Sequence, residues 1–190
     1  YEWKHIFDWF KNHDKAKATF ATKIVPTNML EYNPNNKVRI RFSMMPQKLA
    51  DELEPNTAKI LDRITAVNLF KEAGYDVHLN FSPVIMYKGW QKDYSELFKL
   101  IDRIVKDKYK KDVLAEVIFL THNYNKHKYN LNNHEEAEKL LWKPSIQENK
   151  TSNYGGMNIR YKRKIKYNLI NDFKDRHNAI VPWNKIRYIF

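Results

Sequence analysis

The sequence predicts an α/β fold in which parallel strands alternate with helices, followed by a β-hairpin and a C-terminal helix. Amphipathic helical segments alternate with short strands, and scarce glycines and prolines mark the joints between them. Strands separated by helices need crossover connections, which favours a parallel sheet. Only four such strands fit before residue 121, too few for a closed eight-stranded barrel of about 250 residues.

The first half of the sheet is predicted from three segments. An amphipathic helix over residues 3–10 precedes an extended segment at residues 18–25. Residues 38–43 alternate strictly between apolar and polar side chains, as a strand does. The first part of the chain therefore reads helix, strand, strand.

A longer helix is predicted over residues 58–73, where apolar side chains recur at helical spacing. Asn56 or Thr57 is expected as its N-cap, and Gly74 as the residue just after its C-terminus. The alternating strand at residues 77–82 follows directly and is expected to end at Pro83.

The remaining elements follow from the same patterns. A second amphipathic helix is predicted over residues 92–106 and a mostly apolar strand over residues 113–120. Residues 121–133 are rich in Asn, His, Lys and Tyr and are expected to form a long loop. The chain should close with a hairpin at residues 152–161, a basic helix at 163–177 and a last strand at 186–190.

Composition limits the class of protein. With 190 residues, 43% hydrophobic and 14% aromatic, the chain is one domain's worth of folded protein and not intrinsically disordered. No apolar run approaches the roughly 18 residues of a membrane span, and no signal peptide opens the chain, so we expect a cytoplasmic protein that does not enter a membrane. The absence of cysteine excludes disulfides, thiolate nucleophiles and thiolate-bound metals within these residues.

The net charge of +12 is concentrated near the C-terminus. Residues 145–190 hold ten Lys and Arg but three Asp and Glu, which gives +7 of the total. We therefore divide the chain into a sheet region, residues 1–144, and a basic hairpin-and-helix segment, residues 145–190. The absence of an initiator Met before Tyr1 suggests a fragment or a processed product.

Three polar residues stand at predicted strand ends. In a parallel α/β sheet the ligand lies at the carboxyl ends of the strands. Lys23, Ser43 and Ser82 are the last polar residues in the register opposite the helices on three successive strands. They could hold a small anionic or zwitterionic ligand, or they could be polar because loops are hydrated.

The hairpin and the basic helix combine aromatic and basic side chains. Tyr154 and Tyr161 lie beside Arg160, Lys162 and Arg163. Clustered Lys and Arg neutralise phosphates, and exposed aromatics stack on bases, so this combination is typical of nucleic-acid contact. A hydrated helix face with core tyrosines is the alternative.

Three histidines form the third candidate group. His122, His127 and His134 would suit zinc or a similar metal in a metal-dependent nuclease. Their spacing matches no tight ligand motif and no carboxylate pair accompanies them, so hydrated loop histidines are the simpler interpretation.

Several strings, in order, resemble the spore photoproduct lyase family. The resemblance covers most of the chain and is strongest between residues 37 and 98. The strings are Lys37–Ser43, Leu53–Thr57, Arg63–Ala66, Ala73–Tyr75, Ser82–Ile85, Gly89-Trp90, Asn153–Gly155 and Ile186–Tyr188.

The resemblance implies a radical S-adenosylmethionine enzyme with a partial (β/α)6 barrel that repairs a thymine dimer in damaged double-stranded DNA. A Lys and a Ser on successive strand ends contact the methionine part of the cofactor in that family, and Lys23 and Ser43 resemble those positions. Ser82 stands before Pro83 where the lyases usually have Ala, next to the cofactor.

The family also has a β-hairpin whose Arg-Tyr-Gly tip enters the lesion site. Tyr154 and Gly155 match that tip, but Asn153 replaces the Arg. Arg160 or Lys162 is the candidate to supply the missing charge. A wedge with phosphate clamps offsets the few kcal/mol that flipping a damaged base costs.

The family's four-iron four-sulfur cluster needs a Cys-x-x-x-Cys-x-x-Cys loop, which this chain lacks. By the resemblance, the loop would precede Tyr1, as would the family's hydrogen-donating Cys. We therefore expect the C-terminal portion of a radical lyase that needs S-adenosylmethionine, the cluster and a one-electron reductant. A basic DNA-binding module without catalysis is the alternative, and a His-dependent nuclease is a third.

Overall fold

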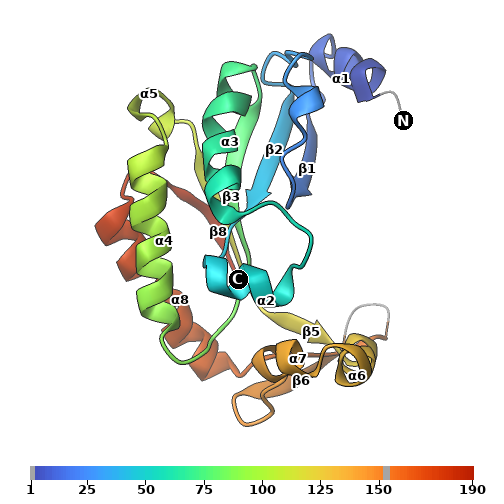
Figure 1. The fold of residues 1–190 in the computed structure, drawn as a ribbon, viewed down its shortest axis with the longest axis vertical. Coiled ribbons are helices and arrows are strands. Elements are labelled where there is room, and N and C mark those ends of the chain that lie inside the picture. Colours follow the sequence, from blue (N-terminus) through green and yellow to red (C-terminus); the bar gives the residue numbers. More distant parts are fainter. Residues whose placement is uncertain (1–2, 152–154) are drawn as a thin grey trace.

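Five parallel strands form the main sheet in the order β1-β2-β3-β4-β8. A computed structural model describes residues 3–151 and 155–190, and Figure 1 shows the arrangement. The strands of this sheet are β1 Ala18–Thr22, β2 Val38–Ser43, β3 Asp76–Val84, β4 Leu114–Phe119 and β8 Ile186–Ile189. The open α/β sheet predicted from the sequence is confirmed, and the described residues form no closed barrel.

A second, antiparallel sheet of three strands lies beyond the end of β4, in the order β5-β7-β6. Its strands are β5 Thr121–Asn123, β6 Gln147–Thr151 and β7 Met157–Tyr161. The predicted hairpin is therefore present as β6 and β7, and its first strand begins earlier than the sequence indicated.

Helices connect the strands. They are α1 Trp3–Lys11, the 3₁₀ turn Thr27–Met29, α2 Gln47–Leu53, α3 Ile60–Glu72, α4 Trp90–Ile104, α5 Asp107–Lys110, α6 Tyr124–Asn133, α7 Glu135–Leu141 and α8 Arg163–Ile180. In the described part of the chain, every helix is too short or too polar to cross a membrane.

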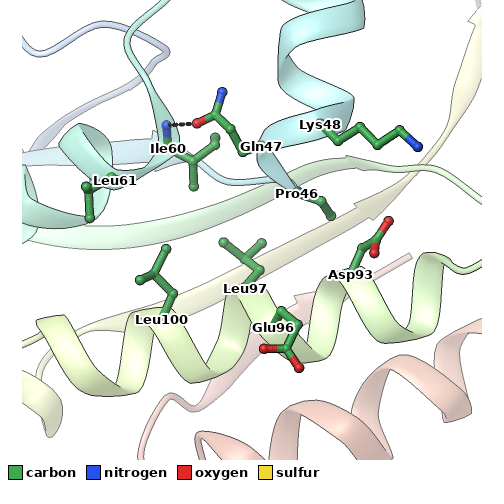
Figure 2. Close-up of a pocket in the computed structure, with 9 residues that line it drawn as sticks. All are labelled: Pro46, Gln47, Lys48, Ile60, Leu61, Asp93, Glu96, Leu97 and Leu100. Carbon is green, nitrogen blue, oxygen red and sulfur yellow. Dashed lines mark hydrogen bonds between the residues drawn. The ribbon is translucent and has the colours of Figure 1, made fainter.

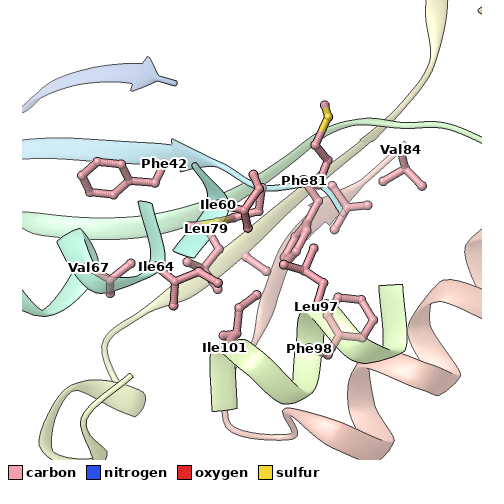
Figure 3. Packing of buried hydrophobic residues seen from close by; sticks show 14 of the residues in the cluster. Phe42, Ile60, Ile64, Val67, Leu79, Phe81, Val84, Leu97, Phe98 and Ile101 are labelled. Carbon is pink, nitrogen blue, oxygen red and sulfur yellow. The ribbon is translucent and has the colours of Figure 1, made fainter. Parts of the chain in front are cut away.

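The core lies between the main sheet and helices α3, α4 and α8. Phe42 of β2 packs edge-on against Phe70 of α3, with ring centroids 5.4 Å apart. Phe81 of β3 packs against Phe98 of α4 and Phe173 of α8, each at 5.6 Å. Figure 3 shows the same layer, with apolar side chains of α3 and α4 directed at the strands. Burial of this apolar surface holds the helices on the sheet.

The opposite face of the sheet is polar and is organised around Glu116 of β4, which is 1% exposed. Its carboxylate accepts hydrogen bonds from Arg41 of β2 (3.0 Å), Arg187 of β8 (2.6 Å) and Tyr188 of β8 (2.5 Å). His78 of β3 lies 3.3 Å away through Nδ1. Burial alone would raise the pKa of Glu116, but hydrogen bonds from Tyr188 and Arg41 and the charge of Arg41 lower it to about 2.

The network continues along β3. The Nε2 atom of His78 lies 3.2 Å from Asp76, which also pairs with Arg39 at 2.8 Å and Lys17 at 3.0 Å. Burial opposes ionisation of Asp76, yet hydrogen bonds from His78 and Lys17 hold its pKa well below the ordinary range. Two carboxylates thus bind together the polar side chains of four neighbouring strands.

The segment at residues 121–133 differs from the predicted loop. It forms strand β5, which pairs with β7, followed by helix α6. The side chain of Asn123 accepts hydrogen bonds from the backbone N–H groups of Asn125 and Lys126 and so caps the helix. The Asn-rich composition predicts a loop, but here one of these residues, Asn123, is the N-cap of a helix.

The N-cap predicted for α3 is also wrong. Lys59 occupies that position, and the Gln47 side chain accepts the hydrogen bond of the Ile60 N–H at 2.7 Å. Asn56 has a positive φ of 62°, and the Thr57 hydroxyl donates to the Glu54 carbonyl instead. The predicted C-terminal end is correct, because the residue after the C-cap is Gly74, with φ 85°.

Strand β3 also differs in its end, because it continues through Pro83 to Val84. The first predicted strand is shorter than expected and stops at Thr22, so Lys23 lies just beyond β1.

Replacing Glu116 with Gln should reduce the dependence of stability on pH. A carboxylate whose pKa is lowered on folding stabilises the protein above its unfolded pKa of about 4.5, and this contribution is lost as the pH falls towards about 2. We expect Glu116→Gln to cost roughly 2–3 kcal/mol at pH 7 and to flatten the curve between these values. Urea unfolding across pH 2–7 measures both effects.

Glu135→Gln is the matched control, because the Glu135 side chain is 66% exposed and pairs only at the surface with Lys139. It should leave the pH curve unchanged. An equally steep curve for Glu116→Gln would contradict the role given to this carboxylate.

Candidate functional site

A pocket of about 290 Å³ opens at the carboxyl ends of the parallel strands. Its walls come from the end of β1, the α2–α3 loop, β3, the β4–β5 junction and α6. Residues that line it include Lys23, Glu54, Pro83, Leu120, His122 and Asn130. This is the edge at which ligands bind to open parallel sheets, and the pocket combines apolar side chains with charged and polar ones.

The buried guanidinium of Arg63, in α3, organises one wall of the pocket and is 0% exposed. It donates hydrogen bonds to the Ser43 carbonyl (3.0 Å), the Ala58 carbonyl (2.9 Å), the Glu54 carboxylate (2.9 Å) and the Thr57 hydroxyl (2.7 Å). A buried charge persists only when it is paired and hydrogen-bonded, and Arg63 meets this requirement. The end of β2 and the α2–α3 loop are thereby fixed to α3.

Lys23 is held by the same loop. Its Nζ atom lies 2.8 Å from the Glu54 carboxylate, and its backbone carbonyl accepts a hydrogen bond from the Ala58 N–H at 3.0 Å. Glu54 is therefore shared between Arg63 and Lys23. Lys23 contacts the buried Glu54 oxygen that accepts no hydrogen bond within the described residues, so its half-exposed ammonium completes the pairing of Glu54 and also lines the pocket.

The other two predicted strand-end residues lie in adjacent strands. Ser43 is the last residue of β2 and is buried, and its register partner in β3 is Asn80. The Oδ1 atom of Asn80 is buried and accepts no hydrogen bond within the described part of the chain. Ser82 is half-buried further along β3. Of the three predicted residues, Lys23 lines the pocket itself, while Ser43 and Ser82 belong to the strands beside it.

The histidines do not form the hydrated loop that we expected. His122 and His127 both contact the buried carboxylate of Glu138 in α7, at 3.0 and 2.6 Å. His134 is exposed and stands between α6 and α7. In the described ranges no group of three His, Cys, Asp or Glu side chains is arranged to hold a metal ion. The nuclease alternative is therefore not favoured.

The base of the hairpin is anchored to the loop after β3. The Tyr161 hydroxyl accepts a hydrogen bond from the Met86 N–H at 2.7 Å, and the Lys143 ammonium donates to the Met86 carbonyl at 2.7 Å. Burial raises the pKa of Tyr161 to about 12, so the phenol is protonated. Tyr161 is thus a core residue and not an exposed stacking aromatic, while Asn153 and Tyr154 lie outside the described residues.

The basic side chains of this segment are placed differently from one another. Arg160 pairs with Glu148 at 3.0 Å, and the Lys162 ammonium donates to the Ser145 carbonyl at 2.8 Å. Arg163 is exposed at the first turn of α8. Burial and then the nearby charges of Arg160 and Lys150 lower the pKa of Lys166. Such mutual repulsion marks a surface with excess positive charge, as phosphate-binding surfaces have.

A second cavity, of about 350 Å³, lies between α2, α3 and α4. Figure 2 shows Leu97 and Leu100 of α4 directed towards Ile60 and Pro46, with Asp93 and Glu96 at the edge. It contains none of the residues that the sequence predicts for a site.

Sequence reasoning missed two members of the site, Arg63 and Glu138. Arg63 occupies a position of α3 where the helical pattern predicts a buried apolar side chain. An Arg at such a position indicates a buried ion pair. Glu138 lies 16 residues from His122 and offers no local signal, because its helix reads as an ordinary charged surface helix.

The fold and the pocket define an open parallel-sheet α/β protein with a ligand pocket at its strand ends. A sequence model of the spore photoproduct lyase family matches residues 1–190. The chain belongs to this family.

Individual relatives agree. The chain is 27% identical over 150 residues to spore photoproduct lyase of Bacillus subtilis (strain 168), which covers 73% of this chain and 43% of that protein. It is 29% identical over 97 residues to spore photoproduct lyase of Clostridium acetobutylicum, covering 50% and 29%. The matched residues thus span less than half the length of these relatives.

Solved structures share the fold. A spore photoproduct lyase complexed with dinucleoside spore photoproduct superposes with a TM-score of 0.91 at 21% identity. A mutant with bound AdoMet and dinucleoside spore photoproduct gives the same values, and each match covers 99% of this chain and 55% of the other.

Replacing Arg63 with Met should destabilise the protein strongly. Glu54 would stay buried with only the half-exposed Lys23 as partner, and breaking a buried pair from one side typically costs about 3–5 kcal/mol. The double variant Arg63→Met/Glu54→Leu should recover part of this loss, because it leaves no buried charge. Urea unfolding measures all three proteins.

Arg103→Met, on the exposed side of α4, is the control and should change stability by less than about 0.5 kcal/mol. A similar small effect for Arg63→Met would show that the guanidinium does not hold this wall together.

Proposed function

We propose that this chain is part of a DNA-repair lyase of the spore photoproduct lyase type. In this proposal the pocket at the strand ends receives S-adenosylmethionine, and the segment from β6 to α8 engages damaged double-stranded DNA. The family membership supports the proposal, as do the relatives solved with AdoMet and dinucleoside spore photoproduct. The single observation in this chain that carries it is the Lys23 ammonium at the pocket, beside Ser43 and Ser82.

The residues present fit the cofactor. A zwitterionic ligand needs charged and polar groups at an otherwise apolar pocket, and Lys23 supplies the cation. The Asn80 amide oxygen is buried beside Ser43 and has no hydrogen-bond partner within the described residues, so it can accept a hydrogen bond from a ligand. Lys23, Ser43 and Ser82 would hold the methionine part, and the bound cofactor would supply a 5′-deoxyadenosyl radical.

The residues present do not fit an iron–sulfur cluster. Such clusters are held by thiolates, and the chain contains no cysteine. Residues outside this chain would therefore have to hold any cluster. They would also have to provide the cysteine hydrogen donor and receive the electron from a one-electron reductant.

In the DNA-binding half of the proposal, Arg160, Lys162 and Arg163 contact phosphates. The charge repulsion around Lys166 supports this role, because bound phosphates would relieve it. Asn153 and Tyr154, which lie between β6 and β7 in the sequence, would contact the lesion. The hydrogen bond between Tyr161 and Met86 anchors the base of this hairpin.

Replacing Lys23 with Met in the full-length protein should weaken S-adenosylmethionine binding roughly tenfold, because a charge-assisted hydrogen bond is lost while the alkyl chain stays. Isothermal titration calorimetry measures the affinity. Lys111→Met, an exposed substitution remote from the pocket, is the control. Unchanged affinity in Lys23→Met would remove Lys23 from the site.

If the wild-type protein binds DNA but no S-adenosylmethionine, the chain is a basic DNA-binding module without this chemistry.

Replacing Lys162 and Arg163 with Gln should weaken binding to duplex DNA and lower the salt dependence. Each lost phosphate contact reduces the slope of log K against log salt by about 0.9. We expect the double variant to lower the slope by about two, measured by fluorescence anisotropy between 50 and 200 mM salt.

A second double variant, Lys108→Gln/Lys111→Gln, removes the same charge near α5, at the opposite end of the molecule from the hairpin (Figure 1). An equal fall in slope for this variant would mean that net charge, and not the hairpin surface, governs binding.

A further inference from the structure

The buried carboxylate of Glu138, 2% exposed, gathers three side chains. It contacts Nε2 of His122 at 3.0 and 3.1 Å, Nδ1 of His127 at 2.6 Å and the side-chain amide of Asn130 at 2.6 Å. The His127 ring also stacks on Trp142, with centroids 3.7 Å apart and planes at 10°. Of these neighbours, His122 is buried and His127 is also held by the stacking on Trp142.

This arrangement determines the tautomer of His122. An ionised carboxylate only accepts hydrogen bonds, so the imidazole nitrogen that faces it carries the hydrogen. The Nε2 atom of His122 is therefore the N–H donor. In the neutral ring the other nitrogen, Nδ1, then carries a lone pair and accepts.

His122 lines the same pocket as Lys23. His122 is 8% exposed, and within the described part of the chain its Nδ1 atom has no hydrogen-bond partner and is not fully enclosed. The pocket thus carries a cation after β1 and a fixed acceptor in β5. The lining also includes the apolar side chains of Met45, Pro83, Ile85, Leu120 and Leu141, together with Glu52, Glu54, Asn130 and His134.

We infer that His122 is a ligand-binding residue of this pocket, and that it accepts a hydrogen bond from a hydroxyl or N–H group of a bound nucleoside. Apolar walls suit the faces of a base, and a single oriented acceptor suits a ribose hydroxyl or a base N–H. Glu138 is a positioning residue, because it sets the tautomer and direction of the ring without touching the ligand. This inference rests on the proposed function, which supplies two nucleoside ligands, the cofactor and the lesion.

His122→Gln separates the two nitrogens of the ring. The Gln side-chain amide reaches the place of Nε2 and can still donate to Glu138, but it has no atom at the place of Nδ1. The variant should fold with unchanged thermal stability and lose the contact with the ligand. We expect five- to tenfold weaker binding, as for one lost hydrogen bond.

The experiment uses calorimetry on the full-length protein with two probes, S-adenosylmethionine and a dinucleoside spore photoproduct. Weaker binding of the first probe alone assigns the contact to the cofactor, and of the second alone to the lesion. His5→Gln, on α1, is the control for loss of an imidazole and should bind both probes as the wild type does.

The failure of each idea looks different. If the wild type binds a probe and His122→Gln binds both equally well, His122 is not a ligand residue, although the proposed function stands. If the wild type binds neither probe, the proposed function fails and this inference fails with it.

The role of Glu138 has a readout that needs no ligand. Long-range ¹H–¹⁵N spectra of the 15N-labelled protein at alkaline pH should show His122 protonated at Nε2, and Glu138→Gln should mix the two tautomers because an amide also donates. A His122 ring protonated at Nδ1 in the wild type would overturn the inference.

Discussion

The wall that carries Lys23 and Ser43 depends on the hydrogen bonds of one buried guanidinium. Arg63 is planar and has several N–H donors in fixed directions, so each acceptor around it must stand at a set place. Those acceptors belong to the end of β2 and to the loop between α2 and α3. Because Glu54 also binds Lys23, the position of the residue after β1 follows from the same constraint.

The main sheet obeys a second constraint, the difference between its two faces. Side chains alternate along a strand, so the apolar row that meets α3 and α4 forces a polar row onto the other face. Parallel register places Arg41 beside His78, and Glu116 of the next strand completes the layer. Desolvation of these charges is offset because each Glu116 oxygen has two partners and Asp76 is contacted by His78, Arg39 and Lys17.

Sequence patterns were sufficient where one local signal dominated. The bounds of β2 and the Gly74 end of α3 were predicted correctly, since alternation and a left-handed glycine are local properties. The prediction of a loop at residues 121–133 was wrong. Asn123 can act as an N-cap only where the residues after it form a helix, as they do in α6. The N-cap of α3 was also wrong, because Gln47 reaches it from another helix.

For the site, the strand pattern pointed to Lys23, which lines the pocket although β1 ends one residue before it. The links from His122 to Glu138 and from Glu54 to Arg63 depend on tertiary packing. These pairs form because the partners are buried together in the folded protein, and residue spacing in the sequence does not predict such contacts.

The anchoring of Met86 has a consequence for how this segment can change over evolution. Both groups that hold the Met86 peptide, Tyr161 and Lys143, stand at the foot of the hairpin and not at its tip. Substitutions between β6 and β7 therefore remove neither of these two hydrogen bonds. Under the proposed function, changes in lesion preference can therefore arise between these strands while both contacts to Met86 persist.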